Sequence, residues 1–119
     1  MPYMKIQTNI TITGSRQSPA TDELLAGLSR FLSEMLQKPE RYVMVTCEEG
    51  VPLVFAGTAE PAMFIELKSI GLQESATEQL SADICAYVEQ ALGIAGERIY
   101  IEFSSASRTM WGWNGATFG

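Results

Sequence analysis

The chain begins with the sequence MPYMKIQTNITI, residues 1–12, and this stretch decides how the rest of it folds. Isoleucines at positions 6, 10 and 12 alternate with polar side chains, and this period of two predicts a β-strand with one buried face. Pro2 suits the start of a strand, because its missing N–H lies outside the ladder of hydrogen bonds there. Removal of Met1, which is usual before a small residue, would instead leave a secondary amine at the head of the strand. The segment alone leaves both interpretations of Pro2 open.

Length, composition and charge limit the class of protein. The 119 residues predict a single domain, 1–119, that is long enough for a hydrophobic core. The net charge of −6 argues against binding to nucleic acid or to an anionic membrane surface. No apolar run has the length of a membrane span, and no hydrophobic signal core is present. We therefore expect a cytoplasmic protein, with secretion by a non-conventional route left open.

The residues available for chemistry are few, since the chain contains no histidine. This absence removes the usual general base at neutral pH, the usual partner of a nucleophilic serine or cysteine, and the usual zinc ligand. We predict no metal and no cofactor. An enzyme built on this chain would use carboxylates, lysine, tyrosine or the terminal amine. Cys47 and Cys85 are expected to be separate buried thiols rather than a disulfide or a redox pair.

A first helix is predicted after the opening strand. Ser18 is its expected N-cap and Pro19 its first residue, with Asp22 and Glu23 in the first turn. Pro39 ends the helix. Seven apolar residues recur at the helical period and form its buried stripe: Leu24, Leu25, Leu28, Phe31, Leu32, Met35 and Leu36.

The remaining strands follow from further apolar runs. Residues 41–47 are predicted to form a strand covered on both faces, and a short strand is expected over 51–55. A third strand over residues 62–68 is followed by a loop over 69–72, and a fourth strand covers residues 98–103.

A second helix is predicted between the third and fourth strands. Ser75 and Glu78 have the spacing of a capping box, and Gly93 or Gly96 ends the helix. Its buried stripe consists of five apolar residues: Leu80, Ile84, Val88, Ala91 and Leu92. The tail that follows the fourth strand, residues 104–119, is rich in small and aromatic residues.

The two halves of the chain, about 1–57 and 58–119, repeat one pattern, in which Ile6 lines up with Met63. Each half is a strand, a capped helix and a strand, which is a βαβ unit. The predicted fold class is α/β, an α+β two-layer sandwich with a four-stranded mixed sheet, both helices on one face, and short edge strands. Because two helices cover only one face, we expect the sheet to associate with other copies.

Five segments form a specific combination. They are MP at 1–2, KPERYV at 38–43, EPAMFIELKSIG at 60–71, ERIYI at 97–101 and GWNGATF at 112–118. Together they resemble the macrophage migration inhibitory factor and D-dopachrome tautomerase family of the tautomerase superfamily, and the migration inhibitory factor branch more than the other. The resemblance covers essentially the whole chain. It implies a homotrimer of βαβ-duplicated subunits and a cofactor-independent isomerase. That isomerase is a keto–enol tautomerase of aromatic α-keto acids such as phenylpyruvate, or of dopachrome-like substrates.

The resemblance also implies roles for individual residues. Pro2 is the implied catalytic base after removal of Met1. Lys38 is implied to bind the substrate carboxylate, and Ile70 to form a pocket wall that offers a backbone amide. Tyr100 is implied to enter the site from the neighbouring subunit. The residues implied at the aromatic rim are Trp113 and Phe118.

A proline amine fits this chemistry on physical grounds. A base that moves a proton near pH 7 must be neutral there, and a free α-amine titrates at about 7.7–8.0. Burial among apolar side chains and repulsion from Lys38 both disfavour the ammonium form and lower the pKa of the amine. Pro2 would then be a usable base.

Three residues near the expected pocket depart from the family pattern. Glu102 replaces an asparagine that binds substrate, Tyr3 a smaller or more flexible side chain, and Trp111 an aliphatic one. All three bear on substrate preference. The Cys-x-x-Cys of some family members falls on Ala62 and Ile65, so we expect no thiol redox activity. The alternative function is a non-catalytic, cytokine-like signalling or binding module on the same trimeric scaffold, with an unidentified receptor.

Overall fold

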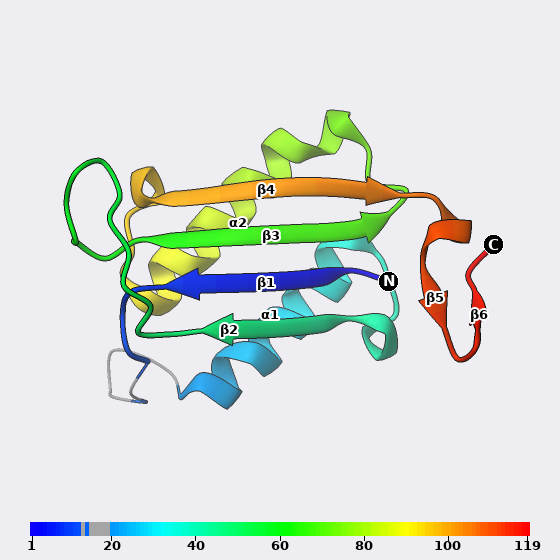
Figure 1. Cartoon of the computed structure of the whole chain (residues 1–119), viewed down its shortest axis with the longest axis horizontal. Helices are drawn as coiled ribbons and strands as arrows, with labels where there is room; N and C mark the ends of the chain where they lie inside the picture. Colours follow the sequence, from blue (N-terminus) through cyan, green and yellow to red (C-terminus); the bar gives the residue numbers. More distant parts are fainter. Residues whose placement is uncertain (13, 15–19) are drawn as a thin grey trace.

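A four-stranded mixed sheet forms the centre of the computed structural model, which describes residues 1–12, 14 and 20–119 (Figure 1). The strands lie in the order β2-β1-β3-β4, with the bounds Tyr3–Thr8 (β1), Met44–Glu48 (β2), Met63–Ile70 (β3) and Ile99–Ala106 (β4). β2 runs parallel to β1 and β4 parallel to β3, whereas β1 and β3 are antiparallel. The first residues of β1 and of β4 therefore lie at opposite ends of the sheet.

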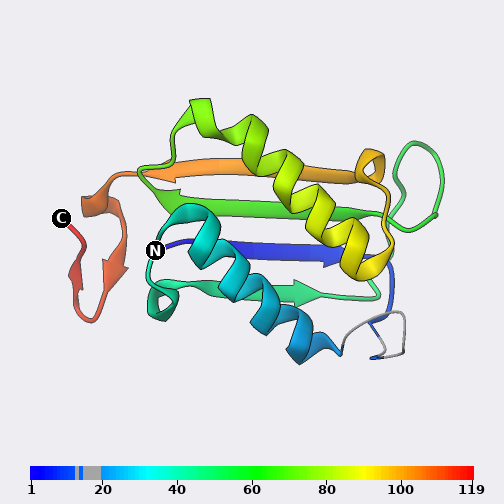
Figure 2. The same ribbon diagram turned by 180° about the vertical axis from the view of Figure 1, so that it is seen from behind.

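Two helices, α1 (Thr21–Leu36) and α2 (Thr77–Leu92), cover the same face of this sheet, as Figure 2 shows. α1 connects β1 to β2 and α2 connects β3 to β4, so each half of the chain folds as a strand, a helix and a parallel strand. The predicted α/β two-layer sandwich is confirmed. No helix of the part of the chain that the structure describes is long and apolar enough to cross a membrane.

The core lies between the sheet and the helices and follows from the two periodicities in the sequence. Met4 and Ile6 of β1 alternate with partly exposed residues, and both are fully buried against Ile65 and Leu67 of β3 in the core cluster. The buried residues of the helices are Leu24, Leu28 and Leu32 in α1 and Leu80, Ile84 and Val88 in α2. Because a slip of one residue would expose the buried face of β1, this core fixes the register of β1 and the place of Pro2.

The predicted helix starts need correction. Ser18 and Pro19 lie outside the described residues, and the N-cap of α1 is Ala20. The expected Asp22 and Glu23 do occupy the first turn. For α2 the capping box is wrong, because the chain makes a 3₁₀ turn over Glu74–Ala76 before the helix begins. The hydroxyl of Thr77 donates to the carbonyl of Glu74 at 2.8 Å, and the N-cap Ala76 provides no side-chain hydrogen bond to the helix.

The ends of both helices agree better with expectation. α1 ends at Leu36, and Gln37 adopts a left-handed conformation two residues before Pro39. Gly93, one of the two predicted stop residues, is the left-handed residue that ends α2, with φ 73°.

The second strand is shorter and more exposed than predicted. Residues 41–47 do not all form it, because Glu40–Tyr42 makes a 3₁₀ turn and β2 spans Met44–Glu48. β2 pairs with β1 alone and is an edge strand, so Met44 is 65% exposed and the expected cover on both faces is wrong for the single chain. The strand expected over residues 51–55 is also absent from the structure; Phe55 pairs with Thr58 in one isolated bridge.

The predicted third and fourth strands stop too early. The expected loop over 69–72 is wrong, because Ser69 and Ile70 pair with Ser105 and Ala106 at the ends of β3 and β4. Both Ser69 and Ile70 are buried, which explains why pairing continues there. After β4 the tail forms a hairpin of β5 (Gly112–Trp113) and β6 (Ala116–Thr117), which lies beyond the sheet end that holds the N-terminus (Figure 1).

Candidate active site

Pro2 lies at the head of β1, where the β1–β2 pair holds it. Its carbonyl accepts a hydrogen bond from the N–H of Met44 at 3.0 Å, and the Met1 ammonium donates to the carbonyl of Tyr42 at the same distance. The Pro2 side chain is fully buried. The first two residues are thus ordered by backbone contacts to the segment that precedes β2.

A cavity of about 470 Å³ opens beside Pro2, within the range of small-molecule pockets, about 300–1,000 Å³. Four parts of the chain form it: the head of β1, the segment before β2, the end of β3 and the C-terminal hairpin. Its lining residues are Pro2, Tyr3, Arg41, Tyr42, Val43, Met44, Lys68, Trp111, Gly112, Trp113 and Phe118.

Three aromatic rings make one wall of the cavity. The ring of Tyr42 meets the rings of Trp113 and Phe118 edge-on, with centroids 5.4 Å and 5.5 Å away, and those two rings stack at 5.6 Å. The hairpin turn at Asn114 and Gly115 has positive φ at both residues, 52° and 76°, as a tight two-residue turn requires. The turn and the ring contacts hold the hairpin against the segment before β2.

Two cations line the cavity, and none of its lining residues is acidic. The guanidinium of Arg41 lies over the ring of Tyr42, 4.7 Å from its centroid. Lys68 is an exposed residue of β3, next to Tyr3 of β1 in the strand register. In a chain with a net charge of −6, the cavity is a place where anions are attracted rather than repelled.

The terminal amine has an altered pKa. Burial, first, and repulsion from Lys38, second, lower the pKa of the Met1 ammonium from 8.0 to about 6. At pH 7 an amine with this pKa is largely neutral. The environment at the head of β1 therefore favours a basic, unprotonated amine.

Lys38 and Ile70 do not line this cavity. They line a second hollow of about 280 Å³, together with residues of the α1 end and of the chain after β3. The backbone holds Lys38 firmly, since its N–H donates to the carbonyl of Ser33 at 3.1 Å and its carbonyl accepts from the Ser33 hydroxyl at 2.6 Å. Its charge repels the Met1 ammonium and contributes to the lowered pKa of that group.

Tyr100 and Glu102 lie away from Pro2 in the single chain. Tyr100 pairs with Phe64, which pairs with Gln7 near the far end of β1. Its side chain is 62% exposed, and its ring lies 4.7 Å from that of Phe55. Glu102 is exposed in the middle of β4. A single chain brings Pro2, Tyr3, Trp113 and Phe118 to one cavity and leaves Tyr100 and Glu102 outside it.

Most of the cavity residues were not anticipated from the sequence. Tyr42, Val43 and Met44 follow from the parallel pairing of β2 with β1, which sets the chain before β2 beside Pro2. Lys68 follows from the antiparallel pairing of β3 with β1. Arg41 also lines the cavity and was not predicted from the sequence. The predicted βαβ unit, with its parallel strands, could have identified Tyr42, Val43 and Met44. No sequence signal indicated the register of β3, which places Lys68 at the cavity.

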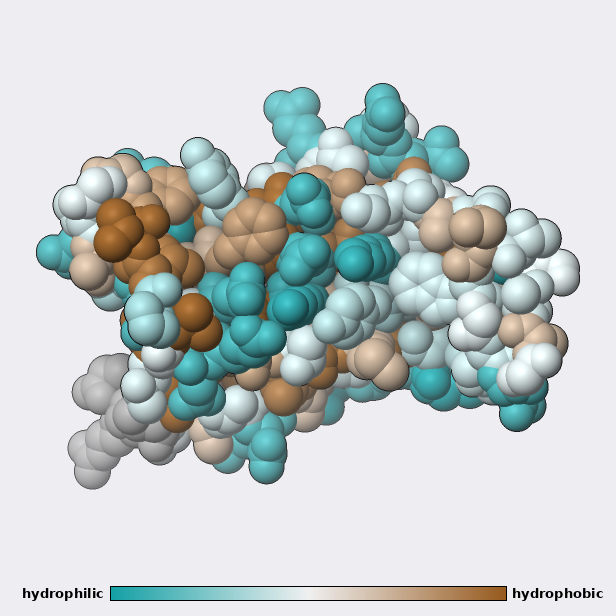
Figure 3. Space-filling view, viewed as in Figure 1, coloured by the Kyte–Doolittle hydropathy of each residue, from teal (hydrophilic) through white to brown (hydrophobic). Residues whose placement is uncertain are grey.

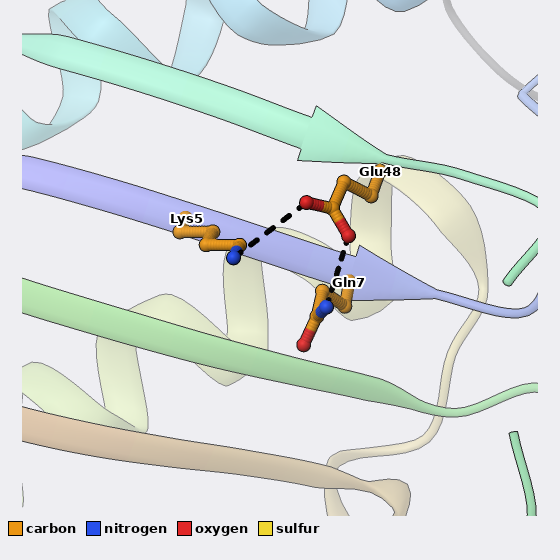
Figure 4. Close-up of polar contacts among 3 residues, drawn as sticks. All are labelled: Lys5, Gln7 and Glu48. Atoms are coloured by element: carbon orange, nitrogen blue, oxygen red, sulfur yellow. Dashed lines mark hydrogen bonds and ion pairs between the residues drawn. The ribbon is translucent and has the colours of Figure 1, made fainter.

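The open face of the sheet carries polar contacts between neighbouring strands. Lys5 lies 3.6 Å from Glu48, and the Gln7 amide donates to the same carboxylate at 2.9 Å (Figure 4). This hydrogen bond, first, and the charge of Lys5, second, lower the pKa of Glu48. Figure 3 shows polar side chains gathered over the middle of this face.

Neither a metal site nor a reactive thiol is evident in the described residues. No group of three His, Cys, Asp or Glu side chains is placed there to hold a metal ion. Cys47 and Cys85 are free, as predicted, but half-buried rather than buried. Burial, with smaller contributions from Glu49 and Glu48, raises the pKa of the Cys47 thiol to about 11, which keeps it from acting as a thiolate near pH 7.

Known proteins are similar to this chain in sequence over nearly its whole length. The family model described as "Macrophage migration inhibitory factor (MIF)" matches residues 1–119. The macrophage migration inhibitory factor homolog of Trichinella spiralis is 34% identical over 99% of this chain and 100% of its own length. The homolog of Brugia malayi is 32% identical over the whole of both chains.

Solved structures of migration inhibitory factor homologues are similar to this chain in fold. The migration inhibitory factor homologue from Prochlorococcus marinus has a TM-score of 0.87 and 42% identity, with 98% of this chain and 99% of that chain covered. The structure from Trichinella spiralis has the same TM-score and coverage at 32% identity.

Proposed function

The chain belongs to the macrophage migration inhibitory factor family, and from this premise we propose that it is a keto–enol tautomerase of aromatic 2-oxo acids such as phenylpyruvate. The observation that carries the proposal is the place of Pro2: buried at the head of β1, beside a cavity with aromatic walls and two cations. The proposed enzyme needs no cofactor, because every step is a proton transfer.

Pro2 is the proposed base, in the form that follows removal of Met1. Its secondary amine takes a proton from the β-carbon of the keto acid, and the electron pair of that C–H bond forms the C=C bond of an enolate. The prolinium passes its proton through solvent water to the enolate oxygen, which completes the enol and restores the neutral amine. In the reverse direction the enol proton passes through water to the Pro2 amine, and the prolinium delivers it to the β-carbon, so atoms and charge balance.

The environment of the N-terminus supports a basic amine. Burial and Lys38 lower the pKa of the Met1 ammonium to about 6, and Pro2 is the next residue. The same two causes would act on the amine of Pro2 once Met1 is removed. A base with a pKa close to the working pH is the most effective catalyst, because it is mostly neutral and still accepts a proton readily. The amine is therefore suited to work near pH 7.

The walls and charges of the cavity support the substrate class. An aromatic ring fits against Tyr42, Trp113 and Phe118, whose rings contact one another at one side of the cavity. The family resemblance assigns the carboxylate beside the reacting carbon to Lys38 and the backbone amide of Ile70. Both residues line the second hollow of the single chain, so this assignment rests on the resemblance alone. Lys38 would then serve twice, since its charge both attracts the substrate and lowers the pKa of the base.

A homotrimer completes the proposed site. Tyr100 and Glu102 lie outside the Pro2 cavity of their own chain, so they reach a site only from a neighbouring copy. β2 and β4 are edge strands with unpaired outer sides in the described residues, and the open sheet face is free of helices. Association of three copies would cover these surfaces and bring a tyrosine to each cavity.

Processing of the N-terminus provides the test. Preparations with and without Met1 are separated by mass, and their rates of phenylpyruvate ketonisation are compared at equal concentration. The rate is expected to follow the fraction of chains that begin at Pro2, because Met1 turns the proline nitrogen into an amide. Chains that retain Met1 and still react at the full rate would contradict the proposal.

A further inference from the structure

The cations at the cavity outnumber the charges of the proposed substrate. Lys38, which lies outside the cavity lining, accounts for the single carboxylate of phenylpyruvate. Lys68 and Arg41 line the cavity itself, and a monocarboxylate gives them no counterpart. Both side chains are exposed in the single chain, so their N–H donors can reach a ligand group in the cavity.

Lys68 has no partner on its own sheet. Its neighbours across the ladder are Tyr3 on β1 and Ser104 on β4, and neither has a carboxylate. The next residue along β3 on the same face is Glu66, which lies across from Lys5 of β1. Among the described residues, no carboxylate comes within 4.0 Å of the Lys68 ammonium. This ammonium is therefore available to an anion in the cavity.

One face of the Arg41 guanidinium lies against the ring of Tyr42, and the N–H donors at its edge have no acceptor among the described residues. The guanidinium stacks on Tyr42, and the described residues supply it with neither an ion pair nor a side-chain hydrogen bond. A guanidinium fixed in this way presents several N–H donors in a plane that matches a carboxylate. Since Tyr42 also belongs to the aromatic wall, an anion bound by Arg41 would lie at the edge of the space proposed for the substrate ring.

We propose that Lys68 and Arg41 bind a second anionic group, so that the preferred substrates are 2-oxo acids with a second carboxylate on an aromatic or apolar body. This inference rests on the proposed tautomerase function and assigns its specificity to two residues. Lys38 takes the carboxylate next to the reacting carbon, the aromatic wall packs on the body, and Lys68 with Arg41 takes the distal carboxylate.

The kinetic test compares two substrates that differ only in that distal group: phenylpyruvate and its para-carboxy derivative. The original protein is expected to have the higher kcat/KM for the diacid. Lys68→Gln and Arg41→Gln are each expected to lower the ratio of the two kcat/KM values about tenfold, the loss of one charged hydrogen bond, mainly through KM. Arg30→Gln is the matched control, since it removes a cation from the exposed side of α1 and leaves the cavity unchanged.

A binding test separates this inference from the proposed function. The Kd values of 3-phenylpropanoate and its para-carboxy derivative, neither of which reacts, are measured by calorimetry on the same four proteins. Tighter binding of the diacid that is lost about tenfold in Lys68→Gln supports the inference even if no tautomerase activity is found. Equal binding of the two acids, or equal losses for both in Lys68→Gln and Arg41→Gln, would overturn it. In the latter case these cations bind the proximal carboxylate instead.

Discussion

Each end of the sheet has an arginine that lies over an aromatic ring, but the two arginines differ in their hydrogen bonds. At the end that holds the N-terminus, Arg41 lies over the ring of Tyr42 and lines an open cavity. At the other end, Arg98 lies over the ring of Phe55, 5.2 Å from its centroid, beside Tyr100. The difference is in the donors. Those of Arg98 are used by the chain, whereas those of Arg41 have no acceptor among the described residues.

The contacts of Arg98 show what a structural arginine does. Its guanidinium donates to the carbonyls of Phe55 and Pro61, each at 3.0 Å, and to that of Glu60 at 2.9 Å. The irregular segment between β2 and β3 is thereby fixed to the start of β4, although the expected strand does not form there. An arginine beside aromatic rings is thus part of the scaffold when its donors are satisfied, and part of a site when they are free.

Replacement of the two arginines gives the largest expected contrast in stability. Arg98→Ala removes these charged hydrogen bonds and leaves the Pro61 carbonyl without a donor. The Phe55 and Glu60 carbonyls each keep one other donor, from Thr58 and Asn9. The substitution is expected to lower the free energy of unfolding by about 2–4 kcal/mol. Arg41→Ala removes a surface contact and should change it by less than about 0.5 kcal/mol. Urea denaturation at one fixed protein concentration measures both. Equal losses would show that the two arginines have the same role.

Lys38→Ala tests whether this lysine binds the substrate carboxylate at the sheet end that holds Pro2. KM for phenylpyruvate is expected to rise about tenfold, from the loss of one charged contact, while kcat changes less. A phenylpyruvate ester, which lacks the charge, should be affected much less. An equal loss for the acid and the ester would remove Lys38 from carboxylate binding.

The pH dependence of kcat/KM sharpens the assignment of the base. Because only the neutral amine accepts a proton, the rate of the processed enzyme is expected to fall as the pH drops through about 6, the pKa of the Met1 ammonium in this environment. Lys38→Ala removes a repulsion that lowers this pKa, so the fall should move to higher pH. A pH profile that is unchanged in Lys38→Ala would separate the base from Lys38.

Replacement of Glu102 gives the smallest expected effect on kcat/KM, because this residue would act only on the site of a neighbouring copy. If the proposed trimer turns the Glu102 carboxylate toward the cavity of a neighbouring copy, that charge repels anionic substrates. Glu102→Asn is then expected to raise kcat/KM for phenylpyruvate about two- to fivefold, the range of a solvated charge pair. Steady-state kinetics on the trimer measure it. A lower kcat/KM would show that the carboxylate takes part in binding.

The elements that depend on local pattern were predictable from the sequence. Alternation identified β1, the helical stripes identified α1 and α2, and Gly93 marked the end of α2. The C-terminal hairpin was missed although its turn, Asn114 and Gly115, is a strong local signal. The errors at the start of β2 and α2 share one cause. Short 3₁₀ turns precede both elements, and no periodicity announces a turn of three residues.

The site was only partly predictable, because its residues meet through pairings that are distant in sequence. Pro2, Trp113 and Phe118 were identified by their resemblance to a family, and the structure brings them to one cavity. Lys68 reaches that cavity through the antiparallel register of β1 and β3, which depends on packing of the whole core. Arg41 differs from Arg98 only in the acceptors around it, which no sequence pattern shows.

The central claim is that the amine of Pro2 moves the proton, and one insertion tests it most directly. An alanine inserted between Met1 and Pro2 still permits removal of methionine but converts the proline nitrogen into an amide. The account predicts that the phenylpyruvate rate falls to background, a loss of about 10²–10⁴-fold, while sedimentation gives the same mass for the assembly as for the original protein, that of the proposed trimer. A mass-verified, trimeric insertion variant that keeps the original rate would contradict it.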